Sequence, residues 1–197
     1  QPFGFWDALG HIDASLTPTA TLRITGLASG DEGSLGPSRG ANEVTWENAG
    51  AGLRLRYLPP GQALLTDVHI YGSRMRSTSQ ADVSDADFYG GSFGLRYLFD
   101  RATFAMGMQA QTGRFATSLA PVGAVRGEEV EEFMTEATVF VELGVTRGAF
   151  EVTPGMRLSA FPSRGQTLGA PTIQAKWGRG AHAIDASAGV AYQAIGA

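Results

Sequence analysis

Two histidines each stand two positions from an aspartate, and these pairs are the groups in the sequence most suited to catalysis. His11 precedes Asp13 and His69 follows Asp67, and residues at i and i+2 of a strand point to the same side. An imidazole held by a carboxylate could act as a general base on water or on a hydroxyl such as that of Ser15. Both pairs fall mid-strand or close to a short turn, so we expect a role in a polar network and predict no catalytic residue.

Other chemistry finds little support in the composition. The 197 residues include no cysteine, which excludes disulfides, thiolate metal sites and a cysteine nucleophile. No dinucleotide-binding loop, phosphate-binding loop, zinc-protease motif or nucleophile elbow is present, and we expect no cofactor and no bound metal. The formal net charge of −4 gives no electrostatic reason to bind nucleic acid. No run of apolar residues is long enough for a transmembrane helix.

Glycines and prolines punctuate the sequence at short intervals, and between them apolar and polar residues alternate with a period of two. This alternation predicts β-strands. No shift in composition marks a boundary, so residues 1–197 are predicted to be one all-β domain. Ten segments show the pattern: Phe5–Leu16, Ala20–Ser29, Trp46–Leu58, Ala63–Met75, Phe88–Phe99, Thr103–Gly113, Glu132–Val145, Ala149–Ala160, Pro171–Gly178 and His182–Ala194.

The connections between these segments alternate between tight and long. The tight ones are Thr17–Thr19, Pro59–Gln62, Asp100–Arg101, Thr146–Arg147 and Arg179–Ala181. The long ones are Gly30–Thr45, Ser77–Asp87, Ala116–Glu131 and Phe161–Ala170. This alternation is typical of an antiparallel up-and-down β-barrel. We predict ten strands; the alternative, eight strands from Ala20 to Gly178, leaves the alternating first and last segments unexplained.

Within the predicted strands, charged and apolar side chains fall on opposite faces, because alternate residues point to opposite sides. In one strand, Phe93 and Tyr97 lie on one face while Ser92 and Arg96 lie on the other. The exceptions lie where strands run into long loops: Arg74, Arg76 and Arg114. Aromatic residues gather near the short turns: Tyr57, Tyr97, Phe99, Phe104, Phe150 and Trp177. We therefore predict that the apolar face meets lipid and that the polar face lines a lumen. A soluble lipocalin-like barrel with an apolar cavity is the alternative.

The polar faces carry charges of both signs that could pair across neighbouring strands. The simplest registers of the tight turns predict three pairs: Asp13 with Arg23, Arg54 with Asp67, and Glu136 with Arg157. The predicted lumen charge network comprises Asp13, Arg23, Arg54, Asp67, His69, Arg96, Glu136, Glu142, Arg157 and Asp185. Because ten strands enclose little room beyond side chains, such a lumen would be plugged by ion pairs or only narrowly wet.

The predicted long loops are acidic. With their edge residues they hold Asp31, Glu32, Glu43, Glu47, Asp82, Asp85, Asp87, Glu128, Glu129, Glu131 and Glu132, opposed only by Arg39, Arg126 and Arg164. Clustered carboxylates could bind a divalent cation or a partner protein, and the candidate residues are Asp82, Asp85, Asp87, Glu128, Glu129 and Glu131. Their spacing matches no known calcium loop, so a solvated acidic rim is the simpler interpretation.

These features together resemble the small bacterial outer-membrane β-barrel proteins over nearly the whole chain, by pattern and without a diagnostic motif. The resemblance implies a Gram-negative outer membrane, with membrane lipid and lipopolysaccharide as neighbours. The chain departs from that family in ending on Ala197 instead of an aromatic residue. With ten strands, both ends of the chain also fall on the long-loop side.

Four functions fit this pattern. The first is a non-enzymatic barrel with a structural, adhesive or complex-scaffolding role, which would imply a protein partner in a membrane complex. The second is a narrow porin-like pore for small solutes, favoured if the lumen charges are separated instead of paired. The third is a hydrolase at the barrel rim, where outer-membrane proteases and lipid-modifying barrels place such groups. The fourth is the soluble ligand-binding barrel.

Overall fold

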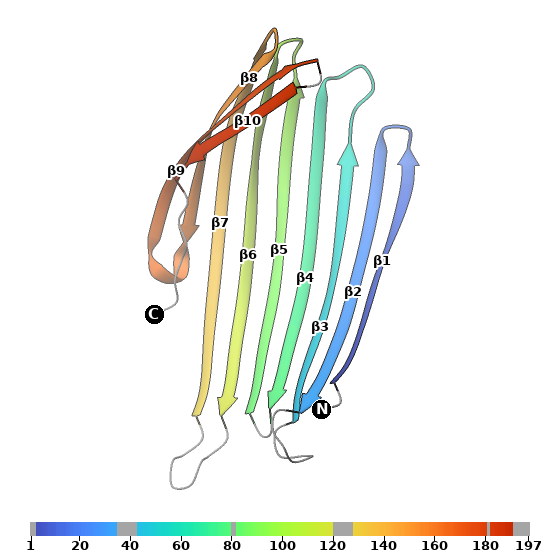
Figure 1. The fold of residues 1–197 in the computed structure, drawn as a ribbon, viewed down its shortest axis with the longest axis vertical. Coiled ribbons are helices and arrows are strands. Elements are labelled where there is room, and N and C mark those ends of the chain that lie inside the picture. Colours follow the sequence, from blue (N-terminus) through green and yellow to red (C-terminus); the bar gives the residue numbers. More distant parts are fainter. Residues whose placement is uncertain (1–2, 35–42, 80–81, 120–127, 181, 191–197) are drawn as a thin grey trace.

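The computed structural model is an antiparallel β-sheet of ten strands that follow one another in chain order (Figure 1). It describes residues 3–34, 43–79, 82–119, 128–180 and 182–190. The strands are β1 (Phe3–Thr17), β2 (Ala20–Ser34), β3 (Glu43–Tyr57), β4 (Leu64–Ser79), β5 (Asp82–Leu98), β6 (Ala102–Leu119), β7 (Glu128–Arg147), β8 (Phe150–Phe161), β9 (Gln166–Arg179) and β10 (His182–Gly189), with a short 3-10 turn, η1 (Pro162–Arg164), between β8 and β9. Within these ranges, no helix has the length and apolarity that a membrane crossing requires.

Each strand pairs with its neighbours in sequence, so the predicted up-and-down arrangement is confirmed, with ten strands and not eight. The sheet is curved, and its β8–β10 end bends away from the plane of the other strands (Figure 1). Among the described residues no ladder joins β1 to β10, and the sheet is open. Both of its edges therefore present unpaired backbone groups, which a hydrocarbon environment does not tolerate.

The strands extend much further toward the long-loop end than the alternation predicted. β5 already begins at Asp82 and β7 at Glu128, inside segments predicted to be loops. The nine acids predicted inside the long loops belong to strands, as do the two edge residues Glu47 and Glu132, which the prediction already placed in strands. The nine are Asp31, Glu32, Glu43, Asp82, Asp85, Asp87, Glu128, Glu129 and Glu131. The loop assignment was wrong because cross-strand pairing continues where the side chains become charged. Arg39 and Arg126 lie outside the described residues.

The registers of the tight hairpins test the three predicted charge pairs. Asp13 stands directly opposite Arg23, as predicted. Arg54 stands opposite His69 and Arg56 opposite Asp67, a register two residues away from the prediction, and Arg54 reaches Asp67 diagonally. The third pair was wrong.

In the β7–β8 hairpin, Arg157 stands opposite Phe140 and not opposite Glu136. The turn there is formed by Gly148 and Ala149, not by Thr146–Arg147. Gly148 has φ of 63°, a left-handed conformation that glycine adopts without strain. Placing the turn two residues later moves every pair in the hairpin.

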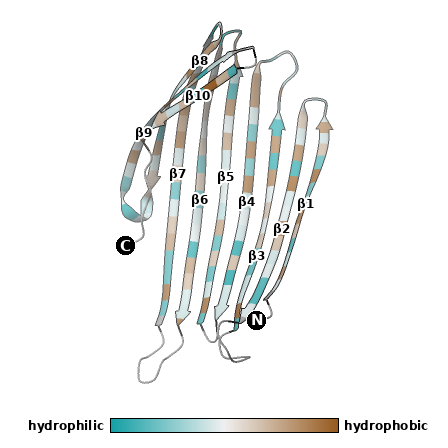
Figure 2. Ribbon diagram, in the orientation of Figure 1, coloured by the Kyte–Doolittle hydropathy of each residue, from teal (hydrophilic) through white to brown (hydrophobic). Residues whose placement is uncertain are grey.

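The register places the strand charges and the apolar side chains on opposite faces. The direct neighbours Leu55, Val68, Phe93, Met108 and Val139 form one row across β3–β7 on the apolar face. The alternation along each strand is visible in Figure 2. An apolar groove of about 410 Å³ runs over β5–β8 on this face. We call this the outer face and the opposite one the inner face.

Exposed aromatic side chains mark both ends of the apolar part of the outer face. Tyr97 and Phe99 lie near the short turns with ring centroids 4.6 Å apart. Tyr89 and Phe133 lie toward the loop end and are about 60% exposed. Tyr89 and Tyr97 share β5, and at about 3.3 Å per residue their separation is about 26 Å along the strand. This is the scale of the apolar band of outer-membrane barrels.

Beyond that band the outer face carries two rows of alternating charge. Arg74, Asp87 and Arg114 are direct neighbours across β4, β5 and β6, and Arg76 stands opposite Asp85 in the next row. Ion-pair distances are 3.2 Å from Arg74 to Asp85, 3.7 Å from Arg74 to Asp87 and 3.8 Å from Arg114 to Asp87. The sequence singled out these arginines as exceptions, and the pairs explain why they lie on the apolar parity.

Glu131 of β7 extends this network by accepting a hydrogen bond from Arg114. This hydrogen bond, together with the negative charges of Glu131, Asp87 and Asp85, raises the pKa of Arg114 above its ordinary value. The network joins the loop-side ends of β4, β5, β6 and β7 on the outer face.

We expect Asp87→Asn to loosen the loop-side ends of β4–β6, because the side chain is only 17% exposed and pairs with both Arg74 and Arg114. The expected loss is about 0.5–1 kcal/mol of unfolding free energy, measured from the urea midpoint in detergent. Glu129→Gln is the matched control, since Glu129 is exposed and makes no ion pair within the described ranges. Equal losses in the two variants would show that the pairing contributes nothing.

Candidate functional site

The inner face carries a chain of hydrogen bonds that crosses five strands, from β4 to β8. The hydroxyl of Tyr71 donates to Oε1 of Gln111 at 3.0 Å, and Nε2 of Gln111 donates to Glu136 at 3.1 Å. Oγ1 of Thr138 donates to the same carboxylate at 3.0 Å and lies 2.7 Å from the hydroxyl of Ser159. Every link is satisfied within the sheet, so this belt fixes the positions of the polar groups that line the inner face.

Tyr71 reaches across β5 to β6 only because Gly90 lies in its path. A Cβ built at Gly90 would lie 2.5 Å from both Cζ and Oη of Tyr71. Gly94, four positions along the same strand and on the same face, has no atom within 4 Å of the equivalent point. Gly90 is therefore needed for the close approach of the ring, whereas Gly94 leaves open space.

We expect Gly90→Ala to destabilise the sheet by about 1–3 kcal/mol, because the methyl group displaces the Tyr71 ring and breaks its bond to Gln111. Gly94→Ala is the matched control, and we expect it to leave the unfolding free energy unchanged or slightly raised. Urea unfolding in detergent measures both. Adding Tyr71→Ala to the Gly90 variant should remove the steric part of its cost; an undiminished cost would contradict the role given to the ring.

Charges on the β1–β4 side of the inner face are paired. Asp13 binds Arg23 at 2.7 Å, with His11 3.7 Å from the same carboxylate. Asp67 accepts hydrogen bonds from the Nε of Arg54, at 2.9 Å, and from the Nε of Arg56, at 3.0 Å, and it also forms an ion pair with the Nη2 of Arg54 at 2.8 Å. No ion pair or hydrogen bond joins Asp67 to His69. The predicted pairing of lumen charges is thus present on this side, with the carboxylate of Asp67 held by arginines instead of by the histidine.

His69 is not positioned against the Asp67 carboxylate as the histidine of a catalytic dyad would be. Its ring centroid is 5.2 Å from that of Tyr71, at an interplanar angle of 32°. No serine hydroxyl is hydrogen-bonded to it among the described residues. These contacts make His69 part of the inner wall beside the polar belt.

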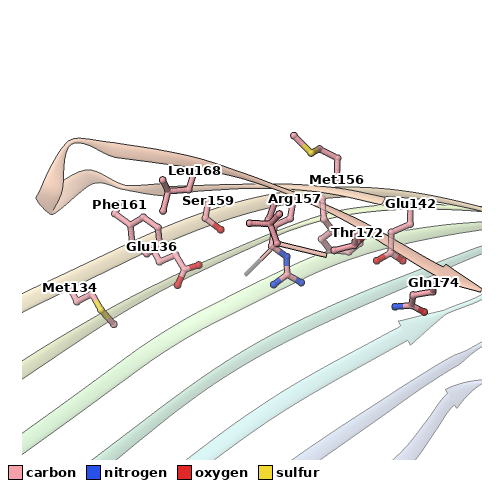
Figure 3. Close-up of a pocket in the computed structure, with 13 residues that line it drawn as sticks. Met134, Glu136, Glu142, Met156, Arg157, Ser159, Phe161, Leu168, Thr172 and Gln174 are labelled. Atoms are coloured by element: carbon pink, nitrogen blue, oxygen red, sulfur yellow. The ribbon is translucent and has the colours of Figure 1, made fainter. Parts of the chain in front are cut away.

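The β7–β9 part of the inner face holds a concave pocket of about 540 Å³, which we call the glutamate pocket. Glu136, Glu142, Arg157, Ser159 and Gln174 extend into it from three neighbouring strands, while Met156 points the other way (Figure 3). Glu136 is held by the belt described above. Glu142 and Arg157 form no ion pair with any residue that the structure describes, so both remain available to a polar solute.

A second pocket, of about 250 Å³, lies nearer the short turns on β3–β6. It is lined by Arg54, Arg56, Asp67, Ser92 and Arg96, and we call it the arginine pocket. Like Glu142 and Arg157, Arg96 forms no ion pair within the described ranges. On this part of the inner face, positive groups outnumber negative ones.

Phe140 lines both pockets and separates them. Its ring covers Gly107 of the neighbouring strand so closely that a Cβ there would lie 2.7 Å from two ring carbons. Sequence analysis did not identify Phe140. The signal that could have identified it is a large aromatic side chain in mid-strand, whose nearest neighbours on the polar face of the same strand are Thr138 and Glu142.

Asp185, the last of the predicted lumen charges, stands opposite Lys176 on the β9–β10 hairpin. The two side chains share a shallow hollow with Gln174 and Ser187 without forming an ion pair within 4 Å. The predicted network is therefore divided: Asp13 pairs with Arg23 and Asp67 with Arg54, whereas Arg96, Glu142, Arg157 and Asp185 form no ion pair with any described residue. Separated charges are the condition under which the sequence favoured a pore.

The acids proposed for a divalent cation do not gather into such a site. Within the described ranges, no group of three or more acidic or histidine side chains is arranged to hold a metal ion. Asp85, Asp87 and Glu131 are instead neutralised by Arg74 and Arg114. Glu129 is exposed on a strand, and the side chain of Glu128 lies outside the described part of the chain. Asp82 begins β5.

No protein-family model matches the sequence, and no curated protein matches it. Solved structures match the fold. The siderophore receptor PirA from Pseudomonas aeruginosa superposes with a TM-score of 0.75 at 14% identity, covering 98% of this chain and 34% of the receptor. The copper transporter OprC gives 0.75 at 12% identity, covering 95% and 36%. The outer-membrane transporter YddB from Escherichia coli gives 0.72 at 9% identity, covering 88% and 29%.

The chain thus spans about a third of the length of these proteins. The likeness is one of fold: the ten strands are an antiparallel sheet of the kind that forms bacterial outer-membrane barrels. The outer-membrane localisation predicted from the alternating strands agrees with that fold. The soluble lipocalin-like alternative has no counterpart in these matches.

Proposed function

We propose that the ten strands form one sector of the wall of a wider outer-membrane transport barrel, and that their inner face lines the passage of a polar solute. The observation that carries this proposal is the open sheet: β1 and β10 do not pair, yet the sheet superposes on transporter barrels about three times its length. In lipid, unpaired edges of this kind have to be completed by further strands. A wider barrel supplies them and leaves room inside.

The inner face supports the same proposal. A passage for polar solutes needs groups that are held in place but not neutralised, because paired charges offer little to a passing ligand. The polar belt from Tyr71 to Ser159 holds the wall, while Arg96, Glu142 and Arg157 keep their charges without partners in the described ranges. The glutamate pocket is the larger of the two hollows that these groups line.

The test is the conductance of the full-length protein in planar bilayers, with and without urea at a concentration that keeps the β-type circular dichroism. Urea at that level unfolds any segment that fills the lumen but leaves the wall intact. We expect ion current in at least one condition. A protein whose wall is intact and which carries no current in either condition would refute the proposal.

The charges of the glutamate pocket should then set ion selectivity. We expect the double variant Glu136→Gln with Glu142→Gln to shift the reversal potential in a salt gradient toward anion preference, because two negative groups leave the lumen wall. Glu47→Gln is the matched control, since Glu47 has the outer-face parity of β3 and should leave selectivity unchanged. Equal shifts in the two proteins would contradict the assignment of the inner face.

A structural, adhesive or scaffolding role was the first function predicted from sequence. It would use the loop-side acids as a surface for a partner protein, but Asp85, Asp87 and Glu131 already bind arginines of the same sheet. A hydrolase would need a base beside a nucleophile, and Asp67 is held by Arg54 and Arg56 instead of orienting His69. Transport is therefore the function that the geometry supports best.

A further inference from the structure

The arginine pocket has an excess of positive charge. On the short-turn half of β1–β5, four guanidinium groups on the inner face oppose two carboxylates: those of Arg23, Arg54, Arg56 and Arg96 against those of Asp13 and Asp67. The difference, four positive minus two negative, leaves a net charge of +2. His69, in the same row as Arg54, adds to this charge when protonated.

The arginines keep donors that no protein group uses. Asp67 takes the Nε of Arg54, the Nη2 of Arg54 and the Nε of Arg56. A guanidinium has five N–H donors, so each of these two side chains retains N–H groups that can point into the pocket. Arg96 retains all of its donors, because it forms no ion pair or side-chain hydrogen bond within the described ranges.

The pocket also has space beside these donors. A Cβ at Gly94, which stands opposite Asp67, would meet no atom within 4 Å. Ser92 adds a hydroxyl donor two positions away on the same face of β5. The volume of about 250 Å³ accommodates a group of phosphate or carboxylate size.

Negative charge on the neighbouring strands is kept at a distance. The nearest acid on β7 by register is Glu142, which lies in the same row as Arg96 but on the far side of Ala105. The Phe140 ring stands between the two pockets and lines both. One strand, β6, therefore lies between Arg96 and that carboxylate.

We infer that the arginine pocket binds an oxyanion, the phosphate or carboxylate group of a solute, through Arg96 together with the free donors of Arg54 and Arg56. Asp67 orients these two arginines side by side, and Arg96 approaches from the adjacent strand. Guanidinium groups bind both kinds of anion through paired N–H donors. This site is distinct from the glutamate pocket, and it requires only that the inner face be accessible.

The test is NMR line broadening of inorganic phosphate (³¹P) and of acetate (¹³C) by the full-length protein in detergent micelles at low ionic strength. We expect millimolar binding of at least one anion. Arg96→Gln should weaken it about tenfold, the size that a loss of one charged hydrogen-bond donor gives. Arg101→Gln is the matched control, because Arg101 lies in the β5–β6 turn outside the pocket.

The two anions separate the sources of the oxyanion. Broadening of phosphate alone assigns the pocket to phosphate-bearing solutes, and broadening of acetate alone assigns it to carboxylates. The inference is overturned if neither anion is broadened by the wild type, or if Arg96→Gln and Arg101→Gln bind as the wild type does. Heat-modifiable gel migration verifies that each variant is folded. Anion binding without ion conductance would refute only the proposed passage. Ion conductance without anion binding would refute only the anion site.

Discussion

A cysteine at position 92 should react with a charged, membrane-impermeant thiol reagent at least about tenfold faster than a cysteine at position 110, because only the former meets water where thiolate forms readily. Ser92 stands opposite Gln109, so it and Ala110 lie at nearly the same height on adjacent strands. Their side chains lie on opposite faces of the sheet: Ser92 lines the arginine pocket, whereas Ala110 belongs to the outer face. The comparison therefore varies the face and little else.

The protein suits this experiment because it contains no native cysteine. Ser92→Cys and Ala110→Cys are conservative in volume, and each is measured in proteoliposomes and again after unfolding, where the two rates should become equal. The ratio in the folded protein reports which face is wet. Faster labelling at position 110 would mean that inside and outside are reversed and would restore the soluble barrel with an apolar interior.

The two faces could be predicted from sequence because the side-chain period of a strand is fixed at two. Once a stretch such as Phe93 to Tyr97 is extended, parity alone assigns each residue to a face. The pairing of Asp13 with Arg23 followed from the same rule, together with a tight turn that the sequence located correctly. These predictions depend on local geometry only.

The strand ends and the registers of the β3–β4 and β7–β8 hairpins could not be predicted in this way. Asp85 and Arg76 look like loop residues in the sequence because charge usually marks the end of a strand, but across the sheet they neutralise each other at 3.6 Å. The β7–β8 register depended on recognising Gly148 as the left-handed turn residue. Because the turn lies two residues later than predicted, Arg157 does not stand opposite its predicted partner Glu136.

The width of the barrel also could not be predicted from the strands taken one at a time. Alternation indicates that strands pair, but whether the tenth meets the first depends on the curvature and stagger of the whole sheet. The inner-face pockets depend on the same global geometry. Phe140 separates them because its ring lies over Gly107, a contact across a strand pair that the sequence pattern does not specify.

Whether β1 and β10 are neighbours in the membrane is the central question, and disulfide cross-linking of the full-length protein answers it. Ala8→Cys combined with Ala28→Cys is the positive control, because these outer-face residues stand directly opposite on β1 and β2. The test pairs combine Ala8→Cys or Ala14→Cys with Ala186→Cys or Ala188→Cys, all of outer-face parity. Adjacent strands lie about 4.8 Å apart, within reach of a disulfide or a short bismaleimide.

We predict that the control pair cross-links in the folded protein and that none of the four test pairs does so within one chain, because further strands separate β1 from β10. Cross-linking of any test pair as efficiently as the control would mean that the ten strands close on themselves. The protein would then be a narrow barrel filled by its own side chains, and not the wall of a wide passage.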